Sequence, residues 1–276
     1  MKTDYYIVDP TQNITLLIEG AVPACDRARV AGNLMRLEPA AEQAGFISAG
    51  MAQDGTDICL NMAGGEFCGN AAMSAAALYC RKADLQPGAE TAVMVGVSGT
   101  ERPVKVEIEV TDSEKYRGTV YMPPVKSLEL MDFEYDGTRY RLPLVNFGGI
   151  SHIIAEELHD RDAAEKAVKL WCGRLKADAL GLMLFDRAQS RLDPLVYVPG
   201  ADTLFWESSC ASGTTAVGAW LAHESGVPVS LKLREPGGEL GISAIPAGAS
   251  VGSANTAGEL KLTGHVRILR HGEAEI

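Results

Sequence analysis

A short segment that occurs twice constrains the fold of this chain more than any other feature. Each copy begins with a cysteine, continues through small or polar residues that include glycine, and then runs into mostly apolar residues, over 68–80 and 210–223. The first of these runs has almost no polar face, which predicts a helix buried on all sides. The two cysteines lie 142 positions apart, about half of the 276 residues. We therefore predict a duplicated chain with one cysteine-headed helix in each half.

Strand and helix signals recur in the same order in both halves. Period-2 alternation of apolar residues over 104–110 is typical of a half-buried strand. Helices are expected over about 27–37, 70–80, 162–174 and 211–223, and strands over 5–8, 14–18, 45–48, 56–61, 91–97, 104–110, 119–122, 140–146, 152–155, 180–185, 195–198, 231–233, 242–245 and 260–266. Strands that alternate with helices in this way predict an α/β (α+β) protein of two domains of equal design.

Composition narrows the classes of partner. The 36 acidic residues exceed the 25 basic ones and give a formal charge of -11, which argues against a nucleic-acid partner. No signal-peptide pattern follows the N-terminus and no apolar run reaches the length of a membrane span, so we expect a cytoplasmic protein without a membrane partner. The six cysteines form no CxxC pair and accompany no histidine cluster, so we expect free thiols and no metal site.

A cysteine at the start of a buried helix has a defined chemistry. The first N–H groups of the helix and its positive dipole end attract an anion, and Gly69 and Gly213 allow the backbone to approach one closely. The same field favours the thiolate of Cys68 and Cys210. A carboxylate held between two such helix ends would have its α-carbon flanked by two sulfurs. One thiolate could then remove the α-proton while the other thiol delivers a proton to the opposite face, with no cofactor.

The residues around the two cysteines are similar to a known family. Glu66–Ala71 and Ser209–Thr214 resemble the paired cysteine motifs of diaminopimelate epimerase, and the resemblance extends to Asn13 and to the closing segment 262–264. It implies two pseudo-symmetric domains, 1–130 with 265–276 and 131–264. Each would be a mixed β-sheet or barrel around a central buried helix, and the active site would lie in the cleft between them. The resemblance also implies that Cys68 and Cys210 are the acid and base.

The chain departs from diaminopimelate epimerase at positions that contact the substrate side chain. The stretch 198–201 has no counterpart of the family's arginine for a distal carboxylate, and 148–152 differs from its Gly-Asn-Pro-His segment. Segments 42–46, 65–70, 181–186, 206–210 and 236–238 look more like the histidine racemases of staphylopine-type pathways. An acidic residue such as Glu42 suits an imidazole or another cationic side chain better than it suits a carboxylate.

The sequence therefore predicts a cofactor-independent amino-acid racemase, with histidine as the first choice of substrate. Glu207 is a candidate for holding the substrate ammonium, with an ordinary surface charge as the alternative. Glu42 and Asn13 are candidates for substrate contact, with a solvated helix-end charge and a turn residue as the respective alternatives. Diaminopimelate epimerase or another racemase of the same fold is the alternative, and a redox dithiol or a carboxylate-binding protein is the alternative from another class. The accepted side chain, the pathway and a homodimer stay open. The predicted substrate-binding residues are Asn13, Glu42, Gly69, Asn70, Glu207, Ser212, Gly213 and Thr214.

Overall fold

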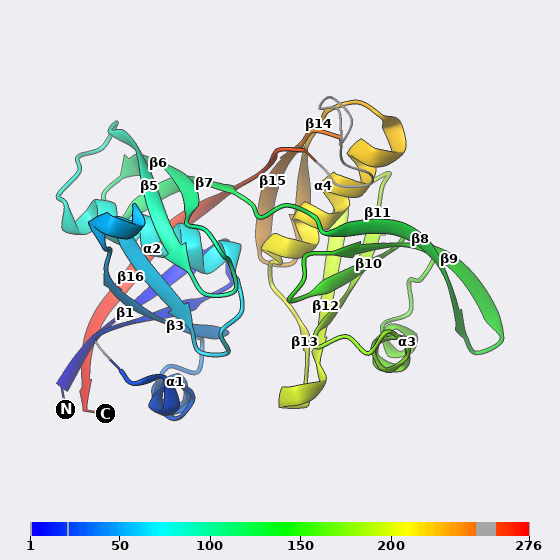
Figure 1. Cartoon of the computed structure of the whole chain (residues 1–276), viewed down its shortest axis with the longest axis horizontal. Coiled ribbons are helices and arrows are strands. Elements are labelled where there is room, and N and C mark those ends of the chain that lie inside the picture. Colours follow the sequence, from blue (N-terminus) through cyan, green and yellow to red (C-terminus); the bar gives the residue numbers. More distant parts are fainter. Residues whose placement is uncertain (1, 21, 247–257, 276) are drawn as a thin grey trace. The chain divides into compact units, whose positions relative to one another are not determined.

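The computed structural model describes residues 2–20, 22–246 and 258–275 and divides the chain into two units (Figure 1). The first unit comprises Met1–Tyr121 and Thr263–Ile276, and the second comprises Met122–Leu262. Each unit is built around one of the two cysteine-headed helices. Within the described residues, no helix combines the length and the apolar character that crossing a membrane requires.

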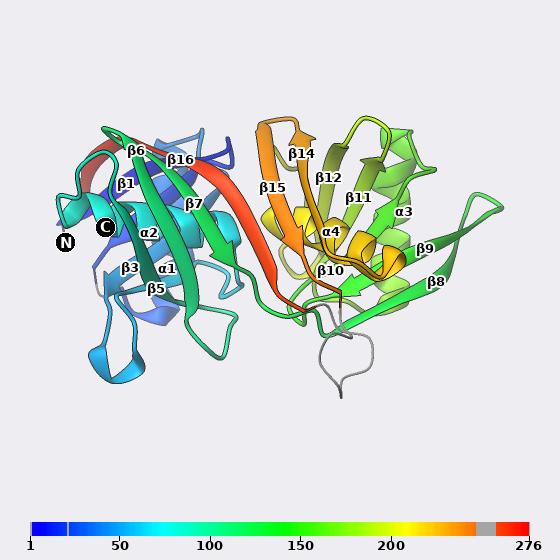
Figure 2. The ribbon, with the colours of Figure 1, turned by 90° about the horizontal axis from the view of Figure 1, so that it is seen from above.

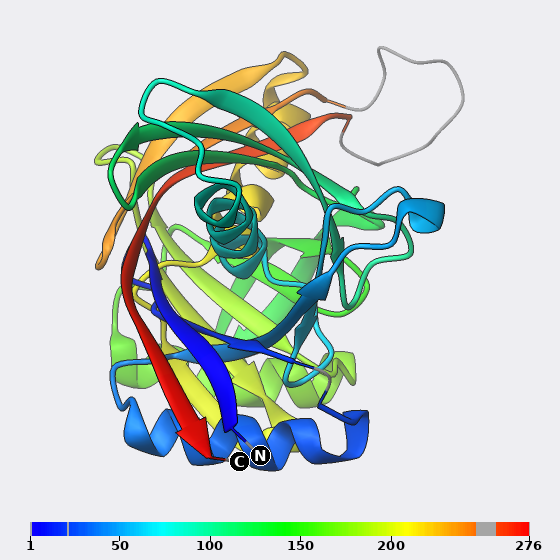
Figure 3. The ribbon, with the colours of Figure 1, turned by 90° about the vertical axis from the view of Figure 1, so that its left-hand side faces the viewer.

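The first unit is a closed barrel around a helix. Its described strands follow the order β1-β2-β3-β4-β5-β6-β7-β16, and β16 also pairs with β1, which closes the ring. The helix α2 is seen nearly end-on in Figure 3, surrounded by strands of its own unit. The elements are β1 (Lys2–Pro10), β2 (Thr15–Glu19), α1 (Ala24–Leu37), β3 (Gln43–Ala49), β4 (Ile58–Met62), α2 (Gly69–Lys82), β5 (Glu90–Val97), β6 (Val104–Asp112), β7 (Lys115–Tyr121) and β16 (Leu260–Glu275), with a 3-10 turn at Ala52–Asp54.

The composition of α2 explains its central position. Residues 69–78 are all buried, because the helix presents small side chains to strands on every side. Basic residues appear only in its last turn, at Arg81 and Lys82, where cations favour the helix dipole. β2 is buried on both faces, since Leu16 and Ile18 pack in the cluster that includes Val30 and Leu34 of α1, while α2 also contacts the strand.

The second unit is a sheet packed against its own cysteine-headed helix. Its described strands follow the order β8-β9-β10-β11-β12-β14-β15, with β13 paired to β12. Figure 2 shows the β14–β15 hairpin beside α4, which also contacts β10 and β9. The elements are β8 (Ser127–Tyr135), β9 (Thr138–Asn146), β10 (Ser151–Ala155), α3 (Arg161–Leu175), β11 (Leu180–Asp186), β12 (Arg191–Val198), a 3-10 turn (Pro199–Ala201), β13 (Thr203–Trp206), α4 (Ala211–Ser225), β14 (Val229–Glu235) and β15 (Gly238–Ala244).

The two units share their strand directions as well as their element order. The strands that flank α1 are parallel, as are those that flank α3, and each pair continues into an antiparallel neighbour. The strands before and after α2 are parallel, β12 and β14 around α4 are parallel too, and each second strand turns back in an antiparallel hairpin. This correspondence is what a duplicated chain produces. The predicted α/β class, with a barrel in the first unit, is confirmed.

Two strands of the second unit, β8 and β13, are not predicted by the sequence. β8 pairs with β9 over its whole length, yet its alternating burial is broken by a run of exposed and half-buried residues. A strand with so little buried apolar surface gives a weak period-2 signal. β13 has only 4 residues and pairs with β12, so it is shorter than the window in which periodicity can be recognised.

Candidate active site

In the first unit, the cysteine predicted to be catalytic is the N-cap of α2. Cys68 has extended backbone angles, and its sulfur accepts a hydrogen bond from the Ala71 N–H at 3.4 Å. This is the position that a serine or threonine oxygen takes in an N-cap. The sulfur is half-buried and lies at the positive end of the helix, which favours its thiolate.

The loop that leads into Cys68 is fixed by the segment after β5. The Ser98 hydroxyl donates a hydrogen bond of 2.8 Å to the Glu66 carbonyl and accepts one of 2.9 Å from the Met62 N–H. Gly99 has a φ of +76°, and a Cβ added there would lie 2.4 Å from the backbone nitrogen of Phe67. Residue 99 must therefore be glycine for the loop to pass this closely.

Three predicted binding residues of the first unit meet in one polar cluster. The Asn13 amide donates to the Glu42 carboxylate at 2.8 Å and accepts from the Asn70 amide at 3.2 Å. Gln43, which sequence analysis did not select, donates to the same Asn13 oxygen at 2.6 Å. Asn13 and Asn70 are buried, and Asn70 follows Gly69 in the first turn of α2. We call Asn13, Glu42, Gln43 and Asn70 the Asn13 cluster.

In the second unit, Cys210 is the N-cap of α4 and is buried. Burial raises the pKa of the Cys210 thiol well above its usual value, and the nearby Glu207 and Glu235 carboxyl groups raise it further. The Gly213 amide acts in the opposite direction and favours the thiolate. The balance keeps Cys210 protonated at neutral pH when no ligand is bound.

Gly213 and Thr214 lie in the first turns of the same helix. A Cβ added at Gly213 would lie 2.2 Å from the Met183 sulfur and 3.2 Å from the Cys210 sulfur, so this position has no room for a side chain. Thr214 is buried, and its hydroxyl is hydrogen-bonded to Glu235. Glu235 was not among the residues selected from the sequence.

Ser212 connects Cys210 to a buried histidine. The Ser212 oxygen lies 3.7 Å from the Cys210 sulfur and 2.9 Å from Nε2 of His152. His152 is fully buried, and burial lowers its pKa to about 3, so the ring is neutral. A Cβ at Gly181 would lie 2.1 Å from Nδ1 of this ring, so that glycine makes room for the histidine. A neutral ring can donate from Nε2 to Ser212, which leaves the serine hydroxyl free to donate to the sulfur.

Replacing Ser212 by alanine is expected to raise the pKa of Cys210 further, because the thiolate loses a hydrogen-bond donor. Titration of ¹³C-labelled cysteine side chains by NMR measures this pKa directly. Ser230→Ala is the matched control, because that hydroxyl lies on β14 and contacts only Ser243 among the described residues. An unchanged Cys210 pKa in Ser212→Ala would contradict the connection.

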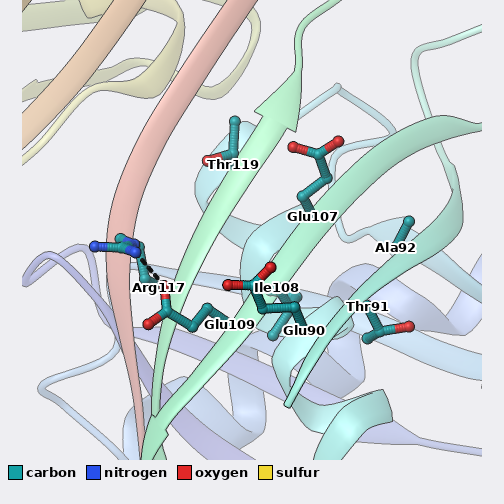
Figure 4. A pocket seen from close by; sticks show the side chains of 8 residues that line it. All are labelled: Glu90, Thr91, Ala92, Glu107, Ile108, Glu109, Arg117 and Thr119. Carbon is teal, nitrogen blue, oxygen red and sulfur yellow. Dashed lines mark hydrogen bonds and ion pairs between the residues drawn. The ribbon is translucent and has the colours of Figure 1, made fainter. Parts of the chain in front are cut away.

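A cavity of the first unit has a lining that does not include Cys68. It measures about 400 Å³ and lies on the face of β5, β6 and β7 opposite the barrel interior (Figure 4). Its charged rim contains three carboxylates and Arg117, which pairs with Glu109. Among the described residues, no group of three or more His, Cys, Asp or Glu side chains could hold a metal ion. The cavity is lined by Glu90, Thr91, Ala92, Glu107, Ile108, Glu109, Arg117 and Thr119.

Comparison with known proteins gives a consistent result. Residues 2–274 match the protein family described as histidine racemase CntK N-terminal domain. A histidine racemase of Fusobacterium nucleatum subsp. nucleatum is 31% identical over 225 residues, which cover 79% of this chain and 81% of that protein. A histidine racemase of Staphylococcus aureus is 29% identical over 249 residues, which cover 84% and 85%.

A solved structure shares the fold at low sequence identity. It is a hydroxyproline epimerase from Agrobacterium vitis with bound trans-4-OH-L-proline. The TM-score is 0.70 at 14% identity, and the match covers 99% of this chain and 92% of the epimerase. At this identity the likeness concerns the fold alone.

Proposed function

The chain belongs to the histidine racemase family, and from that premise we propose that it interconverts L- and D-histidine without a cofactor. The observation that carries the proposal is the placement of the cysteines. Each unit has one cysteine at the N-cap of a buried central helix. Such a position combines a general acid or base with N–H groups that bind a carboxylate.

The two cysteines differ in a way that suits opposite roles. Cys68 is half-buried and accepts the Ala71 N–H, whereas Cys210 is buried beside two carboxyl groups that hold it as the thiol. We propose that the Cys68 thiolate removes the α-proton of one enantiomer while the Cys210 thiol protonates the opposite face. The step leaves Cys68 as a thiol and Cys210 as a thiolate, and the reverse reaction exchanges these states. The Gly213 amide and the Ser212 hydroxyl would stabilise the Cys210 thiolate as it forms.

The remaining predicted residues have proposed roles around the substrate. Gly69, Asn70, Gly213 and Thr214 hold the carboxylate through the first turns of the two helices, with the Thr214 hydroxyl already bonded to Glu235. Glu207 takes the ammonium group, and Ser212 supports Cys210. Asn13 and Glu42 face the imidazole. The negative charge of Glu42 suits the basic character of that ring. The domain limits 1–130 with 265–276 and 131–264, and an active site between the two domains, stay predictions.

Three further points belong to the proposal. We expect the fold to be the diaminopimelate epimerase-like one that the cysteine motifs resemble. We expect the protein to act in the cytoplasm on a free amino acid, with no metal, nucleic acid or membrane. A homodimer stays a prediction, which a measurement of the molecular mass in solution would test. Diaminopimelate and other amino acids are the alternative substrates, because the sequence motifs alone do not exclude them.

A substrate panel tests the proposed function. The reduced protein is incubated with L-histidine, L-arginine, L-lysine and LL-diaminopimelate, and the stereoisomers formed are separated by chiral chromatography. We expect D-histidine to form, and to form faster than any other product. Inversion of diaminopimelate but not of histidine would replace the substrate assignment. No inversion of any amino acid would contradict the racemase proposal and favour a carboxylate-binding or redox role.

A further inference from the structure

Glu235 is one of the alternate residues of the strand β14 whose side chains point into the core. Along this strand, Ser230, Lys232 and Arg234 are exposed, whereas the alternate positions Leu233 and Glu235 are buried. Period-2 alternation therefore turns the Glu235 side chain toward α4, where only 7% of the residue is exposed. Burying a carboxyl group is costly unless its oxygens are hydrogen-bonded, so its presence there calls for a specific use.

Both oxygens of Glu235 contact the first turns of α4. Oε2 accepts a hydrogen bond of 2.6 Å from the backbone N–H of Cys210. Oε1 is hydrogen-bonded to the hydroxyl of Thr214, one turn further along the helix. The same carboxyl group thus bridges the N-cap residue and the buried threonine behind it, and the path of the chain at Cys210 depends on both contacts.

The segments on either side are also tied together. Glu235 pairs with Gly238 across the β14–β15 hairpin, and the Gly237 N–H in its turn donates to the Ser208 carbonyl at 2.7 Å. Ser208 lies two residues before Cys210 in the chain. The hairpin therefore holds the approach to α4 through its backbone and the start of α4 through the Glu235 side chain.

The charged groups that face Glu235 are acidic. Glu207 before α4 and Asp193 on β12 both raise its pKa, and the Cys210 thiol lies beside it. Among the described residues, no lysine or arginine forms an ion pair with it. Burial is the largest effect and brings the pKa to about 8, so the group is mainly protonated at neutral pH. A neutral carboxyl group keeps both contacts, because its two oxygens can still accept from the Cys210 N–H and the Thr214 hydroxyl.

We propose that Glu235 is a positioning residue for Cys210, which clamps the first turn of α4 and thereby fixes the sulfur relative to Ser212 and Gly213. This inference rests on the proposed function for its effect on racemisation, but the clamp itself is defined without a substrate. Ionisation of Glu235 adds a negative charge beside Cys210, so it opposes formation of the Cys210 thiolate. Both hydrogen bonds of the clamp favour the ionised carboxyl group, whereas proton delivery by Cys210 is expected to be fastest when Glu235 is neutral.

Three variants test the clamp. Glu235→Gln keeps a carbonyl acceptor for the Cys210 N–H and an amide donor for Thr214, but it cannot ionise. Glu235→Leu has a similar size and keeps neither contact. Glu239→Gln is the matched control, because this carboxylate lies on the neighbouring strand β15, is solvent-accessible and pairs with Lys232. Thermal unfolding of each variant establishes which of them fold.

The first measurement needs no substrate. The pKa of Cys210 is measured by NMR titration of ¹³C-labelled cysteine in the wild-type protein, Glu235→Gln and Glu239→Gln. We expect Glu235→Gln to lower the Cys210 pKa, because the ionised carboxylate is absent when the thiol titrates, and Glu239→Gln to leave it unchanged. An unchanged pKa in Glu235→Gln would overturn the proposal. This result stands even if no amino acid is racemised, so failure of the proposed function and failure of the clamp are distinguishable.

The second measurement is the rate of histidine inversion. We expect Glu235→Leu to lower kcat about 100-fold with KM changed by less than about threefold, because a misplaced acid slows the proton transfer without removing substrate contacts. In the wild type we expect kcat to fall as Glu235 ionises above about pH 8. Glu235→Gln should keep the wild-type kcat at pH 7 and should not show this fall. A folded Glu235→Leu with wild-type kcat would overturn the proposal. If that variant does not fold, a Glu235→Gln pH profile that superimposes on the wild type would overturn it instead.

Discussion

Replacing either Cys68 or Cys210 by alanine is expected to lower the rate of histidine inversion by about 10³-fold or more. Each variant lacks one of the two groups that move the α-proton, and a positioned general acid or base contributes about 10²- to 10⁴-fold. The Cys210 variant also leaves a small cavity at the start of α4, where the side chain is buried. Because this cavity is small, the loss of inversion rate should appear mainly in kcat and not in the fraction of folded protein. Chiral chromatography of the products and thermal unfolding of each variant measure the two quantities.

Two other cysteines serve as controls for this experiment. Cys59 lies on β4 in the first unit, and Cys172 lies on α3 in the second, where burial raises its thiol pKa. Neither is at a helix N-cap, so Cys59→Ala and Cys172→Ala should keep the wild-type rate. Any residual α-proton exchange in Cys68→Ala and Cys210→Ala should concern opposite enantiomers of histidine, because each variant keeps the base for one face only. Full inversion activity in either catalytic variant would contradict the two-base mechanism.

Replacing Glu42 by glutamine is expected to lower kcat/KM for histidine by about 10- to 100-fold, chiefly through a higher KM. This decrease corresponds to the loss of one hydrogen bond to a charged group, which contributes about 1.5–3 kcal/mol. Glutamine keeps an oxygen that can accept the Asn13 amide, which now donates to Glu42 at 2.8 Å, so the Asn13 cluster should persist. The variant thus removes the negative charge with little change of shape. Steady-state kinetics with both enantiomers of histidine measure the effect.

Glu90→Gln is the control for the loss of charge alone. Glu90 lies in the same unit, at the rim of the acidic cavity on β5 to β7, and is exposed (Figure 4). Its replacement should change neither KM nor kcat. If Glu42→Gln also leaves KM unchanged, Glu42 is a structural partner of Asn13 and does not recognise the imidazole.

The parts of the fold that depend on local composition could be predicted from the sequence. The alanine-rich run after Cys68 has no polar face, and the structure places it at the centre of a barrel. The start of α4 was predicted from the same logic at Cys210. In both units the cysteine is the N-cap, and in the first unit its sulfur accepts the Ala71 N–H.

The polar contacts between distant segments could not be predicted in the same way. Gln43 meets Asn13 only because β3 pairs beside β2, and no pattern within either segment states that pairing. Glu235 did carry a signal, since it occupies the inward phase of a strand whose other inward positions are apolar. To recognise that signal, one must know which alternate positions of β14 point inward. A strand of only 7 residues, which ends at Glu235 just before Pro236, gives a weak period-2 signal.

The most direct test of the central claim follows deuterium during a single pass of the reaction. The wild-type protein is incubated with L-histidine in D₂O, and the reaction is stopped while most substrate remains. The α-position of each enantiomer is then examined by mass spectrometry after chiral separation. Two cysteines that act on opposite faces predict deuterium in the D-histidine product and protium in the remaining L-histidine. Equal deuterium in both enantiomers from the earliest times would contradict the account, because it would mean that one base serves both faces.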